Sequence, residues 1–368
     1  MCIRDRLSAD RLKRVAVIGE FAEKPRYQGN GSSEVKPTKL DSVRDILVKE
    51  YGDAIRFDYA PGYRLDDDDD TRGIAKATAL ARKADVALLL VGLPQHYESE
   101  GIDREHIHLP PAHNALVEAV AAVQPNTVVI LTNGSAVAMP WAHQVPAIVE
   151  GWLHGQAGAG AVTDVVFGAV NPSGKLAETF PRRLEDTPAF LNFPGEHGEV
   201  LYGERIFVGY RWYDARAIAP LFPFGHGLSY TEFAYSDIKV SSKRFSDRDT
   251  LTVSATIENT GQRLGQEVVQ LYVADPVAGV QRPPQELKDF AKVTLEPGAS
   301  TTVSFELNER DFAFYSPRYQ EWLAESGEFE LLVGASSRDI RLRETVVLAS
   351  TRQLSYRTDE YTFLAEFW

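Results

Sequence analysis

Two patterns of apolar residues divide the chain, and the first covers residues 14 to about 178. Short apolar runs, as in buried strands, occur at residues 15–19, 54–60, 85–92, 127–134 and 147–153. Between them, apolar residues recur at helical spacing within residues 43–51, 73–84, 116–123 and 157–168. Strands without a polar face, separated by single helices, indicate an α/β fold with a mostly parallel sheet covered on both faces. Ligands of such sheets bind at the carboxyl ends of the strands.

The second pattern begins near Phe233 and has a period of two. Apolar and polar residues alternate, with turn residues between the segments, over residues 250–261, 267–275, 291–298, 300–308 and 327–336. This alternation predicts an all-β, antiparallel sandwich of the immunoglobulin type.

Residues 201–231 lie between the two patterns and are aromatic, rich in Pro and Gly, and without a clear period. We interpret them as a long connector that packs on both neighbours. The predicted parts of the chain are an uninformative leader (1–11), an α/β domain (12–228, with the connector at 201–228), a β domain (229–348) and a tail (349–368). The aromatic tail predicts packing on the body of the protein, or a chain cut short.

Length and composition narrow the class of protein. At 368 residues the chain exceeds the ~250 to 300 residues at which one core stops growing, which favours two domains. The net charge of -13 disfavours nucleic acid and anionic membranes as partners and favours an uncharged or cationic ligand. Cys2 is the only cysteine, so no intrachain disulfide can form. The chain has neither a signal-peptide core nor a run of about 18 apolar residues, so a periplasmic or secreted location would need an upstream signal.

Several cofactor motifs are absent. GNGSSE, after the first strand, has Glu34 where the dinucleotide motif needs its third glycine. GAVNPSGKL lacks the spacing of a phosphate loop and has Leu176 where that loop needs a hydroxyl. The sequence contains no G-x-S-x-G elbow for a nucleophilic serine. We therefore expect no nucleotide and no other cofactor.

Two groups of polar residues could suggest a metal site. His106, His108 and His113 lie close together but without a recognised zinc spacing, and we interpret them as polar loop histidines at the start of a helix. The acidic run 66–70 lacks the spacers of a calcium loop and predicts a solvated loop. We predict no metal site; a metal-dependent hydrolase built on His106, His108 and Asp103 is the competing hypothesis.

An apolar run leads directly into an acidic loop, whose residues 98–104 read ESEGIDR. Gly101 can adopt a positive φ, so the chain can turn sharply after Glu100 and present its carboxyl group. Asp103 and Arg104 can pair and hold the loop. A carboxyl group in a partly desolvated cleft has a raised pKa and can protonate a leaving group.

Two further segments follow predicted strands: QGNGSS at residues 28–33 and TNGSAV at residues 132–137. Each can be a simple turn. Both would nonetheless lie at the strand ends where a ligand is expected.

Longer segments of the sequence resemble the C-terminal half of glycoside hydrolase family 3, the β-glucosidase and β-xylosidase group. They include VAVIGEFAEKPRYQGNGSS, ADVALLLVGLPQHYESEGIDREHIHLP, IVEGWLHGQAGAGAVTDVVFGAVNPSGKLAETFP and LFPFGHGLSYTEFAYS. The resemblance covers roughly residues 14 to 348. Members of that family have a TIM barrel, an α/β sandwich domain and a fibronectin type III-like domain. The resemblance implies that this chain has the second and third domains without the first.

The resemblance also implies a catalytic role for the acidic loop. In relatives with an E-G-x-D-R loop the Glu is the general acid/base, which here is Glu100; Glu98 is its competitor. Those enzymes cleave with retention, and they use an Asp nucleophile from the barrel about 5.5 Å from the acid. No segment here resembles that nucleophile motif. The resemblance thus implies part of a retaining β-glucosidase whose isolated chain is inactive, with a β-glucoside or oligosaccharide as substrate and the missing barrel as partner.

The residues that the resemblance places at the entrance of the site are Gln28, Gly29, Asn30, Gly31 and Arg104, within or near the loop Tyr27–Ser33. It places the connector segment Arg205–Tyr213 near the domain seams. The sequence is also compatible with a β-xylosidase and with a noncatalytic carbohydrate-binding or scaffolding fragment, and it leaves a homo-oligomer open.

Overall fold

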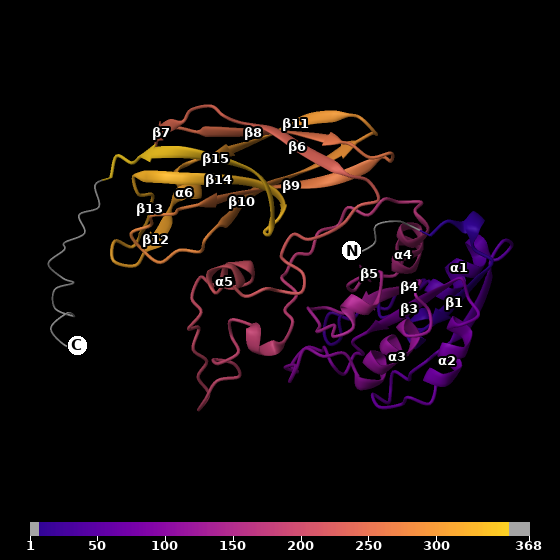
Figure 1. Cartoon of the computed structure of the whole chain (residues 1–368). Coiled ribbons are helices and arrows are strands. Elements are labelled where there is room, and N and C mark those ends of the chain that lie inside the picture. Colours follow the sequence, from indigo (N-terminus) through magenta and orange to yellow (C-terminus); the bar gives the residue numbers. More distant parts are fainter. Residues whose placement is uncertain (1–6, 353–368) are drawn as a thin grey trace.

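The structure is a computed structural model that describes residues 7–352 (Figure 1). Figure 1 shows two regions: an α/β region in indigo to magenta and a β-rich region in orange to yellow. Their fold classes confirm the predicted α/β and all-β architectures. The exact domain boundaries, 12–228 and 229–348, stay a prediction.

The α/β region contains a parallel sheet with the strand order β2-β1-β3-β4-β5. Its strands are β1 (Arg14–Ile18), β2 (Arg56–Ala60), β3 (Val86–Gly92), β4 (Thr127–Thr132) and β5 (Ala147–Glu150). Its helices are α1 (Val43–Tyr51), α2 (Ile74–Ala81), α3 (Pro111–Ala121) and α4 (Gly158–Phe167). Helices α1 and α4 lie on one face of the sheet and α2 and α3 on the other (Figure 1). Because the strand order reverses between β1 and β3, the loops that follow these two strands separate and leave a crevice.

Local sequence fixes the ends of these elements. All seven residues of β3 are buried, as expected for a central strand with no polar face. The Ser42 side chain caps α1 by accepting a hydrogen bond from the Asp45 N–H. Pro111 begins α3, where its missing N–H costs nothing, and Gly168 ends α4 in the left-handed conformation.

A glycine lets β1 and β3 leave the sheet close together. Gly19 follows β1 with φ of 120°, and a Cβ atom there would lie 2.1 Å from the carbonyl oxygen of Leu90 in β3. No side chain fits this position. The chain can therefore turn directly from β1 into the crevice.

The β-rich region consists of two sheets around a second core, with orders β10-β9-β14-β15-β7 and β11-β8-β6. The strands are β6 (Phe233–Val240), β7 (Arg244–Ser246), β8 (Leu251–Asn259), β9 (Gly265–Ala274), β10 (Glu286–Leu295), β11 (Ser300–Leu307), β14 (Gly327–Ser336) and β15 (Asp339–Ala349). A separate hairpin, β12 (Phe314–Ser316) with β13 (Glu321–Leu323), follows the one-turn helix α6 (Glu309–Phe312). One pair, β15 with β7, is parallel, so the sandwich is antiparallel except at this edge.

The connector contacts both regions, through Trp212 and Asp186 on one side and Tyr210 and Tyr272 on the other, but part of it stays exposed. It contains a helix that the sequence pattern did not indicate, α5 (Tyr210–Ala215). Tyr210 is buried against Tyr272 of β9, and its hydroxyl accepts a hydrogen bond from the Leu287 N–H (2.7 Å). Leu201 and Tyr202, in contrast, are 71% and 80% exposed.

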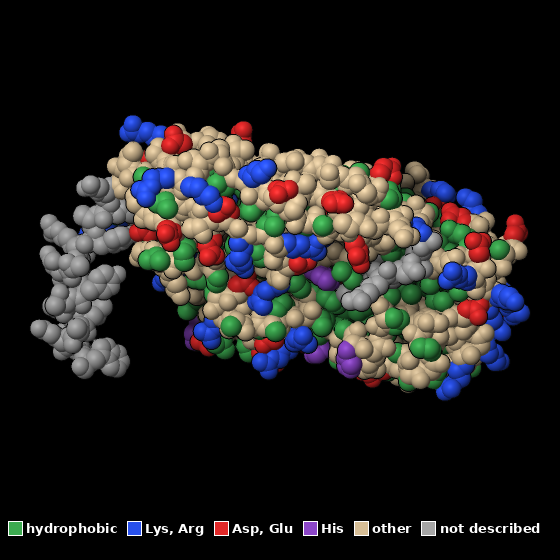
Figure 2. All heavy atoms as spheres, turned by 45° about the horizontal axis from the view of Figure 1, so that its top comes forward, with side chains coloured by type: hydrophobic (Ala, Val, Ile, Leu, Met, Phe, Trp, Pro, Cys, Tyr) green, Lys and Arg blue, Asp and Glu red, His purple; other side chains and the backbone are tan. Residues whose placement is uncertain are grey.

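The surface and termini add three observations. On the face in Figure 2, Lys and Arg side chains are interspersed with Asp and Glu. No helix among residues 7–352 is long and apolar enough to cross a membrane. Residues 1–6 of the predicted leader and 353–368 of the predicted tail lie outside the described residues.

Candidate active site

Three loops meet at the carboxyl edge of the sheet. They follow β1, β3 and β4, and they carry the segments 26–33, 93–104 and 133–136. The sequence analysis expected residues 28–33 and 132–137 at strand ends where a ligand could bind, and the structure brings both segments beside the acidic loop.

Glu100 is at the exposed tip of the acidic loop. One carboxylate oxygen accepts a hydrogen bond from the Ser32 N–H (2.7 Å). The hydroxyl and the N–H of Ser32 together lower the pKa of Glu100. Gly31, with φ of 96°, lies so close that a Cβ atom there would be 2.6 Å from the Glu100 Cβ. Gly101 has φ of 77°, the positive value that the predicted turn requires.

Glu98 is partly buried and surrounded by donors. Its side chain is 12% exposed. One oxygen accepts from Arg26 Nη1 (2.8 Å) and from the Gly134 N–H (2.7 Å). The other accepts from the Ser135 hydroxyl (2.6 Å) and lies 3.5 Å from Arg104 Nη1. The two acids of the loop therefore have different environments.

Arg104 does not make the pair with Asp103 that the sequence suggested. Its Nη1 donates to the Ser135 hydroxyl (2.6 Å) and the Ala136 carbonyl oxygen (3.2 Å), beside Glu98. Sequence reasoning missed Arg26, whose side chain is 3% exposed. The sequence did offer a signal for Arg26, because it is a cation between the buried strand at residues 15–19 and the glycine-rich segment at residues 28–33.

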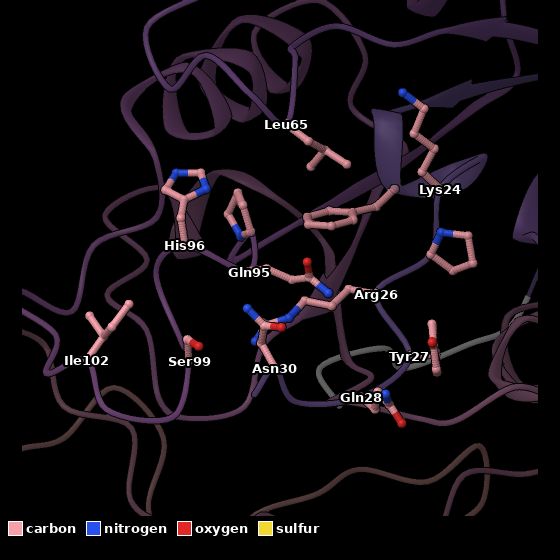
Figure 3. A pocket seen from close by; sticks show the side chains of 13 residues that line it. Lys24, Arg26, Tyr27, Gln28, Asn30, Leu65, Gln95, His96, Ser99 and Ile102 are labelled. Carbon is pink, nitrogen blue, oxygen red and sulfur yellow. The ribbon is translucent and has the colours of Figure 1, made fainter. Parts of the chain in front are cut away.

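Two adjoining pockets open between these loops. The pocket that contains Glu100 has a volume of about 320 Å³ and is also lined by Gly29, Arg104 and Leu153. The larger pocket, about 540 Å³, lies between the loops after β1 and β3 (Figure 3). In Figure 3 the side chains of Arg26, Asn30 and Gln95 approach one another in its middle, with His96 and Ile102 to one side and Lys24 and Tyr27 to the other. Arg26, Asn30, Ser99 and Ile102 line both pockets.

The remaining entrance residues lie around these pockets. Gln28 lines the larger pocket, and its buried amide nitrogen has no hydrogen-bond partner among the described residues. Gly29 lines the smaller pocket, and Gly31 faces Glu100. The segment Arg205–Tyr213 is not among the residues that line either pocket.

The three histidines do not form a cluster. His113 is not a loop residue: it is buried in α3, with its ring 3.7 Å from the Tyr63 ring, and burial lowers its pKa to about 3. His106 and His108 stay close, with ring centroids 5.5 Å apart. Within residues 7–352 no group of three or more His, Cys, Asp or Glu side chains could hold a metal ion.

The acidic run 66–70 is more ordered than a solvated loop. Asp68 contacts the His96 ring (3.1 Å), and Asp70 is buried and bonded to Arg72 (2.7 Å). These contacts fix the run beside the rim of the larger pocket, to which Leu65 contributes.

A buried carboxyl group, Glu150, lies behind the site at the end of β5. One of its oxygens accepts from the Trp152 N–H (2.8 Å) and the other from the Asn133 amide (3.3 Å). Burial raises the pKa of Glu150 to about 7. Asn133 directly precedes Gly134, so Glu150 supports the loop that holds Glu98.

Comparison with known proteins places this architecture in a family. Residues 7–230 match the model of the glycosyl hydrolase family 3 C-terminal domain, and residues 267–337 match a fibronectin type III-like domain. The thermostable beta-glucosidase B of Acetivibrio thermocellus is 52% identical over 344 residues, which are 93% of this chain and 46% of that protein. An exo-alpha-(1->6)-L-arabinopyranosidase of Bifidobacterium breve is 45% identical, covering 95% of this chain and 46% of that protein.

A solved structure agrees. The GH3 beta-glucosidase of Bifidobacterium adolescentis superposes with a TM-score of 0.87 at 45% identity, over 96% of this chain and 52% of that one. The chain spans about half the length of the curated relatives that it matches. With a parallel sheet, an acidic loop at its carboxyl edge and a fibronectin type III-like sandwich in the same order, the chain belongs to glycoside hydrolase family 3, of which it carries the C-terminal domains.

Proposed function

We propose that the whole protein to which this chain belongs is a retaining, exo-acting β-glycosidase that removes terminal β-D-glucosyl residues, and that Glu100 is its general acid/base. The relatives named β-glucosidase support the reaction and the sugar. The observation that carries the assignment of the residue is the contrast between the two acids of the loop.

Only Glu100 is free to meet a substrate. Both oxygens of Glu98 are occupied by donors, and its side chain is 12% exposed. Glu100 lies exposed at the edge of the smaller pocket, where Ser32 is the donor to its carboxylate. A general acid must come within about 2.6 to 3.2 Å of the leaving oxygen, which Glu98 cannot do without breaking its own contacts.

The missing partner of Glu100 is a nucleophile. Retaining cleavage needs two carboxyl groups about 5 to 5.5 Å apart, one on each side of the scissile bond. We assign the second to the barrel domain of the whole protein. A barrel placed over the carboxyl edge would also remove water from Glu100, raising its pKa toward the value that an acid catalyst needs. In the isolated chain one carboxyl group has no nucleophile across the sugar with which to form the glycosyl-enzyme intermediate, so we expect no turnover from the chain alone.

The larger pocket offers room for the leaving group. It adjoins the pocket of Glu100 and presents amide and aromatic side chains, which suit the hydroxyl groups and the apolar faces of a sugar. It also has a basic wall at Lys24. We therefore expect oligosaccharide substrates as well as simple glucosides.

The test is the substitution Glu100→Ala in the full-length protein. General acid catalysis supplies roughly 10²- to 10⁴-fold, so we expect losses of that size with a poor leaving group and much smaller losses with a nitrophenolate. Azide should restore turnover by replacing water when the glycosyl-enzyme intermediate is resolved. Glu105→Ala, which alters an exposed acid of the same loop, is the matched control. Wild-type rates for Glu100→Ala would contradict the assignment, and a full-length protein that cleaves no glycoside at all would favour a noncatalytic role.

A second candidate is an exo-acting L-arabinopyranosidase, because relatives with that name are 45% and 46% identical to this chain. The resemblance assigns the choice of sugar mainly to the barrel. Comparing kcat/KM of the full-length protein on nitrophenyl β-D-glucopyranoside and nitrophenyl α-L-arabinopyranoside decides between the two. A preference of tenfold or more for the arabinoside would replace the glucosidase proposal.

A further inference from the structure

The acidic loop is tied down at a cluster of charged and polar groups in the wall of the smaller pocket, which we call the Glu98 hub: Arg26, Glu98, Arg104, Gly134 and Ser135. Each of the other four residues contacts the Glu98 carboxylate directly, at 2.6 to 3.5 Å. The hub joins the loops that follow β1, β3 and β4. Three separate strands therefore determine where Glu98 lies.

The hub fixes both ends of the segment that carries Glu100. Arg26 donates to the carbonyl oxygen of Leu93, where the chain leaves β3 (Nη1, 2.5 Å), and to that of Glu98 (Nη2, 3.1 Å). At the other end, Arg104 is bonded to the Ser135 hydroxyl and the Ala136 carbonyl oxygen. Between these ends only the tip, residues 99–103, extends outward.

The tip itself has little support besides the hub. Gly101 has no neighbouring atom within 4 Å of the position a Cβ would take, and Glu100 is exposed. Its one described lateral contact is with the segment Gly31–Ser32, which also comes from the loop that contains Arg26. Arg26 thus orients the tip and the segment against which the tip rests.

From this arrangement we propose that Glu98 is a positioning residue for Glu100: its carboxylate, held by the buried Arg26, the partly buried Arg104 and two loop donors, sets the place of the acid/base. This inference rests on the proposed function. Burying the Arg26 guanidinium group is unfavourable unless a carboxylate neutralises it, so Glu98 also keeps this cation in the site. The Glu98 carboxylate faces four donor groups, and a carboxylate has about four lone-pair sites to accept from them. The only other residue type with a carboxylate is Asp, whose side chain is one methylene shorter.

The first test uses the full-length enzyme with Glu98→Gln, Ser135→Ala and the control Glu105→Gln. Small displacements of a catalytic group cost up to roughly 10²-fold, so we expect Glu98→Gln to lower kcat about 10- to 100-fold on a substrate with a poor leaving group. The loss should be smaller on a nitrophenyl glycoside, and KM should change little, because a positioning residue does not bind substrate. Since Glu98 lines the same pocket as Glu100, a rise in KM of tenfold or more with unchanged kcat would make it a binding residue and overturn the proposal. Ser135→Ala removes one hydrogen-bond donor to Glu98 and leaves no charge unpaired, so we expect this variant to fold as wild type does. Its kcat on substrates with poor leaving groups should fall less than that of Glu98→Gln.

The second test needs no activity and uses the 368-residue chain. Glutamyl endopeptidase can cut after Glu100, and mass spectrometry reports that cut alone. We expect cleavage after Glu100 to be at least tenfold faster in Glu98→Gln than in wild type or Glu105→Gln, while the hydrogen exchange of β4 amides is unchanged. Equal cleavage rates would overturn the proposal, as would a loss of kcat in Glu98→Gln that is the same for every leaving group.

The two proposals fail separately. If Glu100→Ala has no effect in the full-length enzyme, Glu100 is not the acid/base, and the positioning role is overturned with it. If Glu100→Ala produces the expected loss but Glu98→Gln and Ser135→Ala behave as wild type, only the positioning role is overturned and the proposed function stands.

Discussion

Replacing the buried Glu150 by Gln should make the protein more stable at neutral pH. Glu150 ends β5 beneath the loop that holds Glu98, and burial raises its pKa from 4.5 to about 7. An acid with a raised pKa binds its proton more tightly in the folded state than in the unfolded state. Its contribution therefore becomes unfavourable as the pH rises from about 4.5 to 7, and it stays unfavourable above 7.

The size of the effect follows from the pKa shift. Each pKa unit corresponds to about 1.4 kcal/mol, so a shift of this size costs about 3 kcal/mol at pH 8 and close to nothing at pH 4. Gln keeps an oxygen that can accept from the Trp152 N–H. Its amide group takes the place of the oxygen that accepts from Asn133 Nδ2, so the Asn133 side chain must turn its Oδ1, a buried atom with no partner among the described residues, toward the new donor. This turn gives up the bond from Asn133 Nδ2 to the Ser135 carbonyl oxygen at every pH, whereas the cost of ionisation is removed only where Glu150 would be ionised.

Thermal unfolding at pH 4.5 and pH 8 measures this difference. For a unit of about 150 to 250 residues, 3 kcal/mol corresponds to roughly 6 to 12 °C in Tm, so we expect the Tm of Glu150→Gln relative to wild type to be higher by that amount at pH 8 than at pH 4.5. The control Glu118→Gln changes an exposed residue of α3 and reports the effect of the substitution itself. If the stability difference between Glu150→Gln and wild type is the same at both pH values, the buried carboxyl group is not the cause and the reasoning is refuted.

Three shorter predictions follow from other contacts. Gly31→Ala should push Glu100 aside, because the new methyl group would lie 2.6 Å from the Glu100 Cβ. We expect kcat of the full-length enzyme on substrates with poor leaving groups to fall at least tenfold. Kinetics at wild-type level would contradict the contact. Gln270→Leu removes a buried amide that donates to the carbonyl oxygen of Ala335 (2.8 Å) and accepts from the Tyr272 hydroxyl. The free energy of unfolding measured in urea should therefore fall by about 2 to 4 kcal/mol. A fall below about 0.5 kcal/mol would mean that water replaces the amide. His113, with a pKa lowered to about 3, should show no protonation between pH 5 and 8, and a ring NMR shift that titrates near pH 6.5 would disprove its burial.

The sequence patterns predicted the regular elements better than the contacts between loops. The buried runs at β1, β3 and β4 have no polar face, so their assignment as parallel strands needed only their period and the helices between them. Arg26 and Glu98, in contrast, are 72 residues apart and meet only because β1 and β3 are neighbours. Period alone does not order the strands of a sheet, so this pair could not be predicted.

Two errors had local causes. His113 seemed a polar loop residue because two histidines precede it, but α3 begins at Pro111 and turns it toward the rings of Phe21 and Tyr63. Helix α5 is six residues long, too short for its period to emerge from an aromatic connector. Its position is set by the burial of Tyr210 against the β-rich region, a contact between distant segments.

The rim of the larger pocket has a consequence for how this fold can change over evolution. Leu65 lines this pocket from the connection between β2 and α2, outside the Glu98 hub, and its N–H donates a hydrogen bond to Glu20 (2.7 Å), which directly precedes the lining residue Phe21. Surface connections tolerate insertions at low thermodynamic cost, since each doubling of a loop adds only about 0.6 kcal/mol of closure entropy. A longer segment grafted at residues 66–70 would overhang the pocket while leaving the acidic loop anchored to three strands. Under the proposed function, the range of accepted leaving groups could therefore change through this connection without any change in the loop that carries Glu100.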